Sequence, residues 1–145
     1  MKSKKIYVAS SWRNEIQPIV VHALRREGHE VYDFKNPKNE EAGFHWSDID
    51  PNWESWSMEK YREALEHPIA RCGYQSDMDA MEWADTFVLV LPCGRSAHLE
   101  LGWAVGKGKK TLILLEKMAP ELMAKMVDHI CVSMSEVLDI VGGTQ

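Results

Sequence analysis

Short apolar runs alternate along this chain with segments whose apolar residues recur at helical spacing. The runs at residues 4–9, 29–33, 86–90, 110–115 and 129–132 predict five β-strands. The first of the intervening helices contains Pro18 and ends at Gly28. Strand, helix and strand within thirty residues form a right-handed crossover unit, which makes the sheet parallel. We therefore predict an α/β fold, a doubly wound five-stranded parallel sheet of flavodoxin or Rossmann type. Ligands are expected where the loops after strands one and three meet.

The remaining helix boundaries follow from capping residues and prolines. Ser57 is expected to cap a helix over residues 58–66, which His67-Pro68 should end or interrupt. Ser76 resembles a cap for a further helix with a buried methionine stripe, and a short helix over residues 119–127 enters through Pro120. Ser133 and Glu136 form a capping box for a final helix.

The segment between the second strand and the middle of the chain differs in kind. Its first part, residues 34–56, carries Phe44, Trp46, Trp53 and Trp56 among prolines, glycine and acidic side chains. A connection this long in a compact domain is usually functional or disordered, and tryptophan argues for order. The segment is either a lid that stacks on a ring or a satellite hydrophobic cluster. We predict one domain over residues 1–145, with residues 34–73 as a Trp-rich lid or insertion.

Composition narrows the class of protein. With 145 residues and a net charge of -5, the chain has no basic stripe for nucleic acid to bind. Cys72, Cys93 and Cys131 are odd in number and lack C-x-x-C spacing, so neither a disulfide framework nor a zinc site is indicated. No apolar run is long enough for a membrane span, and the amino terminus leads into a strand. We expect a cytoplasmic protein.

The chain is organised around the buried run at residues 86–90 and the Pro-Cys-Gly loop that follows it. A helix is expected to begin near Ser96 and to place Glu100 in its first turn, where the helix dipole favours a carboxylate. Ordinary helix-end electrostatics is the alternative reading of Glu100. No G-x-G-x-x-G or P-loop motif occurs, and the histidines do not pair at a metal-ligand spacing. No metal and no redox cofactor are therefore expected.

Carboxylates, hydroxyls, arginines and aromatic rings remain as the chemically useful groups. Carboxylates with rings suit cleavage of an N-glycosidic bond, in which one carboxylate stabilises or captures the anomeric carbon while another group assists the departing base. Three segments carry a more specific resemblance. Residues 6–13 (IYVASSWR), Asp77 and residues 97–104 (AHLELGWA) resemble segments of the nucleoside 2-deoxyribosyltransferase family, which includes deoxynucleoside monophosphate N-glycosidases, and they occur in the family's order.

This resemblance implies a mechanism and a set of site residues. Glu100 would be the nucleophile that forms a covalent glycosyl intermediate, and Asp77 would handle the proton of the base or orient the sugar. Asp79 competes for the role of Asp77, whose alternative reading is a helix-start carboxylate. The residues expected to bind substrate are Ser10, Ser11, Trp12, Arg13, Asp33, Trp46, Gly94, Arg95 and Ser96. Water as acceptor gives hydrolysis, and a second base gives transfer.

The chain departs from the family pattern at two places. Residues 34–73 are longer and richer in tryptophan than in small members, so the base pocket is not carried over. Arg95-Ser96 replaces small or acidic residues, and an arginine beside a helix amino terminus suits a 5′-phosphate, although a solvated Arg95 is the alternative. A nucleoside or nucleotide is the expected partner, and the resemblance implies a homo-oligomer. A TIR-like NAD glycohydrolase and a non-catalytic nucleotide-binding module remain as alternative functions.

Overall fold

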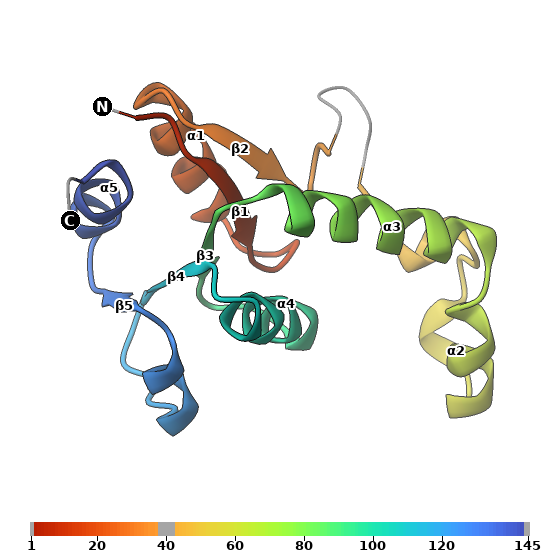
Figure 1. The fold of residues 1–145 in the computed structure, drawn as a ribbon. Coiled ribbons are helices and arrows are strands. Elements are labelled where there is room, and N and C mark those ends of the chain that lie inside the picture. Colours follow the sequence, from red (N-terminus) through yellow and green to blue (C-terminus); the bar gives the residue numbers. More distant parts are fainter. Residues whose placement is uncertain (1, 38–42, 144–145) are drawn as a thin grey trace. The chain divides into compact units, whose positions relative to one another are not determined.

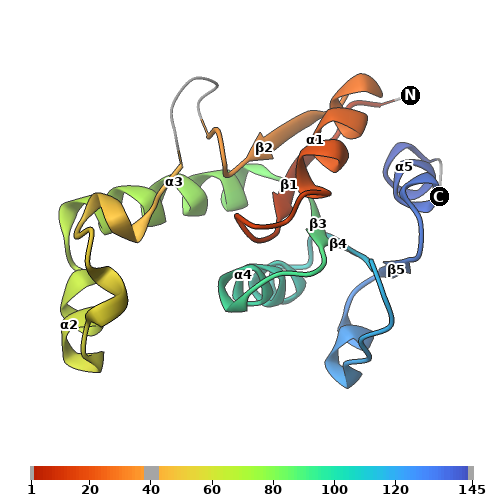
Figure 2. The same cartoon turned by 180° about the vertical axis from the view of Figure 1, so that it is seen from behind.

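Five parallel strands form the sheet of this protein, in the order β2-β1-β3-β4-β5 (Figures 1 and 2). The strands are β1 (Lys5–Ala9), β2 (Glu30–Asp33), β3 (Thr86–Val90), β4 (Lys110–Leu114) and β5 (His129–Cys131). The computed structural model describes residues 2–37 and 43–143, and part of the expected insertion, residues 38–42, lies outside them. The predicted α/β fold with a parallel five-stranded sheet is confirmed, and its strand order is that of flavodoxin-like proteins.

The described residues also form five α-helices and three short 3-10 helices. The α-helices are α1 (Gln17–Arg26), α2 (Met58–Ala64), α3 (Pro68–Trp83), α4 (Arg95–Gly106) and α5 (Met134–Gly142). The 3-10 helices are η1 (Trp46–Asp48), η2 (Trp53–Ser55) and η3 (Leu122–Met126). Ser57 and Ser133 cap α2 and α5 through their side chains, as predicted, by accepting from the amides of Lys60 and Glu136.

One helix prediction was wrong. No helix starts at Ser76, because α3 runs without interruption from Pro68, a residue preorganised for a first helical turn. The short helix expected over residues 119–127 is present as the 3-10 helix η3, which is shorter than expected. None of its residues is buried, so no packed face supports a longer helix there.

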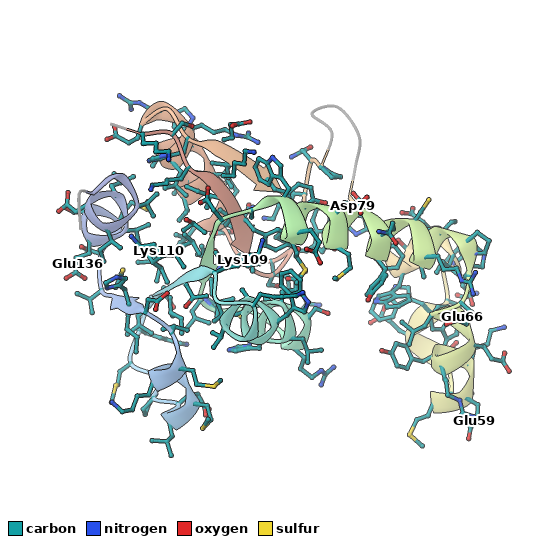
Figure 3. All side chains as sticks on the ribbon, in the orientation of Figure 1. Glu59, Glu66, Asp79, Lys109, Lys110 and Glu136 are labelled. Atoms are coloured by element: carbon teal, nitrogen blue, oxygen red, sulfur yellow. The ribbon has the colours of Figure 1, made fainter. Side chains whose placement is uncertain are left out.

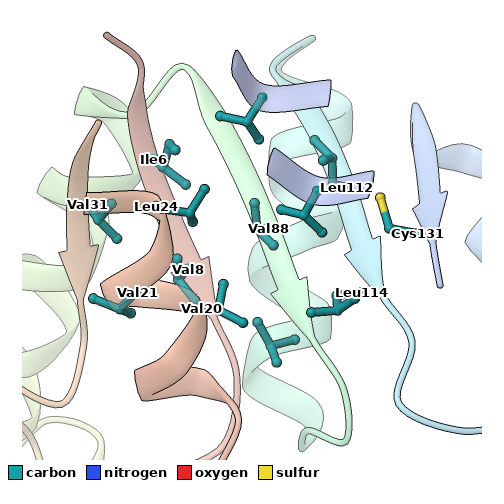
Figure 4. Packing of buried hydrophobic residues seen from close by; sticks show 13 residues of the cluster. Ile6, Val8, Val20, Val21, Leu24, Val31, Val88, Leu112, Leu114 and Cys131 are labelled. Carbon is teal, nitrogen blue, oxygen red and sulfur yellow. The ribbon is translucent and has the colours of Figure 1, made fainter. Parts of the chain in front are cut away.

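The two faces of the sheet are covered by different helices. One face carries Ile6, Val8 and Val88, which pack with Val20 and Leu24 of α1 in a single apolar core (Figure 4). Residues of α5, among them Val137 and Val141, complete this core. Because side chains alternate along a strand, Tyr7 and Phe87 point to the opposite face, where the ring of Phe87 lies 6.1 Å from that of Trp103 on α4.

The chain divides into two compact units, residues 1–33 with 81–145 and residues 34–80. The first contains the sheet. In the second, Trp46 makes edge contacts with Phe44, Trp56 and Tyr61, at ring-centroid distances of 4.8, 5.8 and 5.8 Å. Trp56 also donates its indole N–H to Asp50, and this hydrogen bond and the ring contacts order the segment locally. The Trp-rich segment therefore has an aromatic cluster of its own.

Candidate active site

The loops after β1 and β3 meet at the carboxyl edge of the sheet. The Ser10 hydroxyl donates to the Val90 carbonyl oxygen at 2.8 Å, and the Asn14 side chain donates to the carbonyl oxygens of Val90 and Pro92. In a sheet of this order, β1 and β3 flank the switch point at which ligands bind. The predicted meeting place of the two loops is thus present, and Ser10 takes part in it as a donor to the backbone.

Glu100 lies on α4, directly after the β3 loop, and its position in the helix corrects the sequence prediction. The helix begins at Arg95, one residue earlier than expected, and its first turn contains no acidic residue. Glu100 therefore lies in the second turn, where the dipole of the helix amino terminus has largely fallen off. A different group holds the carboxylate: the Tyr7 hydroxyl of β1 donates to Glu100 Oε2 at 2.5 Å.

Tyr7 is a residue of this site that the sequence analysis missed. Its ring is 1% exposed and stacks between Tyr32 of β2 and Phe87 of β3, with centroid distances of 5.3 and 5.0 Å. A hydroxyl on a ring held in this way has little freedom, so the direction in which it donates is fixed. The signal was available in the strand alternation, which places Tyr7 on the face opposite Ile6 and Val8.

The half-buried thiol of Cys93 also lies near Glu100. Burial, reinforced by the negative charge of Glu100, raises the pKa of Cys93 to about 11. The thiol lies 3.5 Å from Nδ1 of His98, a ring nitrogen that is also 3.0 Å from the Gly94 carbonyl oxygen. Cys93 is therefore protonated at neutral pH and is a poor nucleophile there.

The expected substrate loops present exposed groups at this edge. Trp12 and Arg13 are exposed, and the Ser11 hydroxyl accepts from the Arg13 amide at 3.2 Å. Gly94, Arg95 and Ser96 form the start of α4, which has no side-chain cap on its amide groups. Amides at a helix start and neighbouring guanidinium groups are suited to an anion.

Asp33, at the carboxyl end of β2, is placed differently from the exposed loop residues. It is only 8% exposed, and the Gln17 side chain donates to its Oδ1 at 2.9 Å. Gln17 itself is fully buried on α1. Asp33 is thus held in a buried polar contact at the edge of the sheet rather than displayed on the surface.

Two predicted site residues, Asp77 and Trp46, belong to the second unit. Asp77 is half-buried in the middle of α3, so the reading of Asp77 as a helix-start carboxylate is wrong. Its competitor Asp79, labelled on α3 in Figure 3, accepts from Gln75 at 2.7 Å and is exposed. Trp46 is the centre of the aromatic cluster.

Among residues 2–37 and 43–143, no three histidine, cysteine or acidic side chains gather as metal ligands would. Over the same part of the chain, no helix combines the length and apolar character needed to cross a bilayer.

The strand order and the meeting of the β1 and β3 loops define the chain as a flavodoxin-like α/β protein. No protein-family profile matches its sequence, and no curated protein matches it. Solved structures do match its fold. A 2-deoxyribosyltransferase from Bacillus psychrosaccharolyticus superposes with a TM-score of 0.61 at 20% identity, over 91% of this chain and 88% of that one. The CMP N-glycosidase of Clostridium botulinum superposes with a TM-score of 0.52 at 20% identity, over 96% and 99% of the two chains. Both similarities establish the fold.

Proposed function

We propose that this protein is an enzyme that cleaves or transfers the N-glycosidic bond of a nucleoside or nucleoside 5′-monophosphate. The observation that carries the proposal is the 2.5 Å hydrogen bond from Tyr7 to Glu100 at the carboxyl edge of the sheet. A carboxylate oriented by a buried donor, beside the loops where this fold binds ligands, is suited to attack at an anomeric carbon. The fold shared with a 2-deoxyribosyltransferase and a CMP N-glycosidase supports the same chemistry.

In the proposed reaction a Glu100 oxygen forms a bond to the anomeric carbon while the bond from that carbon to the base nitrogen breaks. The electron pair of the broken bond goes to the base, and we assign to Asp77 the proton that neutralises it or the orientation of the sugar. Tyr7 keeps the carboxylate in one orientation during the attack. Water then releases the sugar from Glu100, or a second base accepts it.

We assign substrate binding to the two loops, to Asp33 and to Trp46. Ser10, Ser11, Trp12 and Arg13 would line one side, and Gly94, Arg95 and Ser96 the other. The uncapped amides of α4, together with Arg13 and Arg95, favour a substrate with a 5′-phosphate. Arginine pairs with phosphate through two parallel donors, which gives orientation as well as affinity.

We also propose that the protein acts in the cytoplasm as a homo-oligomer, a dimer or larger. Apolar side chains of the β4–β5 connection support the second part: Met118, Leu122, Met123 and Met126 are 85, 82, 63 and 52% exposed. Exposed apolar groups that lie close together in the chain are typical of association surfaces.

Base release from a panel of substrates tests the function. The panel contains nucleosides, deoxynucleosides, their 5′-monophosphates and NAD, each separated by chromatography after incubation with wild type or Glu100→Gln. The substitution keeps the shape of the side chain but removes its charge, so we expect it to abolish release. Glu116→Gln makes the same change at an exposed glutamate of the β4–β5 connection and should leave release unchanged.

The substrate that is cleaved decides between the readings of the site. Release of nicotinamide from NAD alone would replace the nucleoside reading with a glycohydrolase. If no substrate is cleaved while a nucleotide raises the melting temperature of both wild type and Glu100→Gln, the protein is a binding module. Where a substrate is cleaved, Asp77→Asn compared with Asp79→Asn tests which carboxylate of α3 takes part in the reaction. We expect a loss of activity only for Asp77→Asn.

A further inference from the structure

One buried asparagine connects the two loops that form the proposed site. The carbonyl oxygen of the Asn14 side chain accepts from the amides of Ile16 and Gln17 at 2.7 and 2.9 Å, at the start of α1. Its amide nitrogen donates to the carbonyl oxygens of Pro92 and Val90 at 2.9 and 3.3 Å, where β3 passes into the α4 loop. The side chain is only 4% exposed, so these bonds are shielded from water.

The bonds of Asn14 extend on both sides into groups that belong to the site. Ser10 also donates to the Val90 carbonyl oxygen, so two side chains of the β1–α1 loop hold the same peptide group. On the other side, the backbone amide of Gln17 donates to the Asn14 side chain, and the side chain of Gln17 donates to Asp33. A continuous polar path thus joins the carboxyl ends of β2, β1 and β3, three neighbouring strands.

We propose that Asn14 is a positioning residue, which fixes the loop at residues 91–94 and through it the start of α4 and the Glu100 carboxylate. This inference rests on the proposed function. Glu100 must meet both the Tyr7 hydroxyl on β1 and the anomeric carbon, and Asn14 holds α4's entry loop to the loop that follows β1. A displacement of about 1 Å at a reacting group reduces the rate on the order of 100-fold.

The substitution Asn14→Asp keeps the hydrogen bonds that the side chain accepts and removes those that it donates. Aspartate keeps the oxygen that accepts from Ile16 and Gln17, and it caps helices as well as asparagine does. Its second oxygen takes the place of the amide nitrogen, so the donor to Val90 and Pro92 becomes an acceptor facing two acceptors. The variant therefore releases the β3–α4 loop while it preserves the start of α1.

The activity arm compares kcat and KM for the substrate that wild type cleaves. We expect Asn14→Asp to lower kcat by about 10- to 100-fold, with KM changed by less than about threefold. Ser133→Ala is the matched control, since it removes the cap of α5 and lowers the melting temperature without touching either loop. Its kcat should equal that of wild type at a temperature where both remain folded.

A second experiment measures how accessible the loop at residues 91–94 is, without any substrate. Cys93 lies in the loop that Asn14 holds, and in Cys72→Ser protein, which lacks the exposed thiol, its alkylation by iodoacetamide can be followed by peptide mass spectrometry. Its raised pKa makes this reaction slow in the native loop. Asn14→Asp should increase the rate roughly tenfold as the loop opens, and Ser133→Ala should not.

The two arms distinguish this inference from the proposed function. A kcat for Asn14→Asp equal to that of wild type, or an unchanged alkylation rate of Cys93, overturns the positioning role. If wild type releases no base, the proposed function fails, and the alkylation rate alone still decides whether Asn14 holds the loop. Asn14→Ser, which retains a capping hydroxyl but does not reach Pro92, replaces Asn14→Asp in both arms if the latter does not fold.

Discussion

The surroundings of Tyr7 fix the direction in which its hydroxyl donates a hydrogen bond. Its ring is stacked on both sides within the sheet, and its proton points at Glu100 Oε2. Donor and acceptor come from β1 and α4, elements that are far apart in the sequence. Strand alternation predicts the face on which Tyr7 lies, but only the register of β1 against β3 and the packing of α4 bring the two atoms within 2.5 Å.

Removing this hydroxyl gives the first prediction. Tyr7→Phe keeps the stacked ring and deletes the donor, so Glu100 loses its orientation with little change in the core. Hydrogen bonds to charged groups contribute about 1.5–3 kcal/mol, so we expect kcat to fall roughly 10- to 100-fold. The measurement is steady-state base release. Tyr74→Phe deletes the hydroxyl of an exposed tyrosine and should retain full activity; equal rates for all three proteins would contradict the role of Tyr7.

Single residues also show where the sequence prediction failed. Glu100 was expected in the first turn of its helix, but α4 starts at Arg95, so the carboxylate depends on Tyr7 rather than on the helix dipole. The position of the helix start decides this, and sequence patterns rarely fix helix ends closely. Asn14 carries no pattern at all, because its partners are backbone groups that follow from the fold.

At the scale of elements, β1, β3 and β4 were the most predictable strands because they are almost entirely buried, and the parallel order follows from the helices between the strands. The helices were less predictable than the strands. Ser76 has the sequence of a cap but lies inside α3, whose true start is set by Pro68. The Trp-rich segment has no periodicity that predicts η1 and η2, which depend on contacts among Trp46, Trp56 and their neighbours.

Two helical glycines provide a matched pair of predictions at this scale. A Cβ on Gly73 of α3 would lie 2.9 Å from the Cβ of Phe44, whereas one on Gly102 of α4 would meet nothing within 4 Å. Gly102→Ala should therefore raise the free energy of unfolding by about 0.5–1 kcal/mol, the usual gain in a helix. Gly73→Ala should lower it by about 1–3 kcal/mol, as overpacking does. Urea denaturation measures both, and stabilisation by both substitutions would show that Phe44 does not pack closely on α3.

The start of β2 carries a prediction about pH. His29 is buried, and its Nδ1 accepts from the Lys4 amide at 3.1 Å, while its Nε2 has no hydrogen-bond partner within the described residues. Burial lowers the pKa of His29 below its usual 6.5, an effect that the charge of Lys4 assists and those of Glu27 and Asp85 oppose. Below pH 6.5 the unfolded chain therefore binds more protons than the folded one, and stability falls as the pH is lowered.

Replacing His29 tests this dependence. His29→Asn keeps an acceptor for the Lys4 amide and removes the titration. The unfolding free energy of wild type should decrease from pH 6.5 toward pH 5 more steeply than that of His29→Asn. Urea unfolding at several pH values gives both curves, and parallel curves would exclude His29 as the source of the slope.

At the scale of the whole molecule, the parallel sheet was predictable from one sequence, and a fold shared at 20% identity shows how much variation this architecture tolerates. The proposed site residues were less predictable, because Glu100 and Asp77 are assigned from a resemblance to a family rather than from a local pattern. Glu100 belongs to the first unit of the chain and Asp77 to the second.

The proposed self-association gives a prediction at this scale. Wild type should sediment at a multiple of the 16.6 kDa chain mass, and Leu122→Asp should shift it toward one chain by placing a charge on the exposed β4–β5 connection. Ile19→Asp places the same charge on an exposed apolar residue of α1 and should leave the mass unchanged. Sedimentation velocity measures all three, and a wild type of single-chain mass would refute the proposal.

The protonation of the Cys93 thiol affects which products the proposed enzyme can form. A thiolate beside a reactive sugar would compete with the carboxylate and leave a thioglycoside, a bond that water does not readily hydrolyse. With a pKa of about 11, only about one thiol in ten thousand is ionised at pH 7. The negative charge of Glu100 helps to maintain this state, so the proposed nucleophile also keeps the neighbouring thiol protonated.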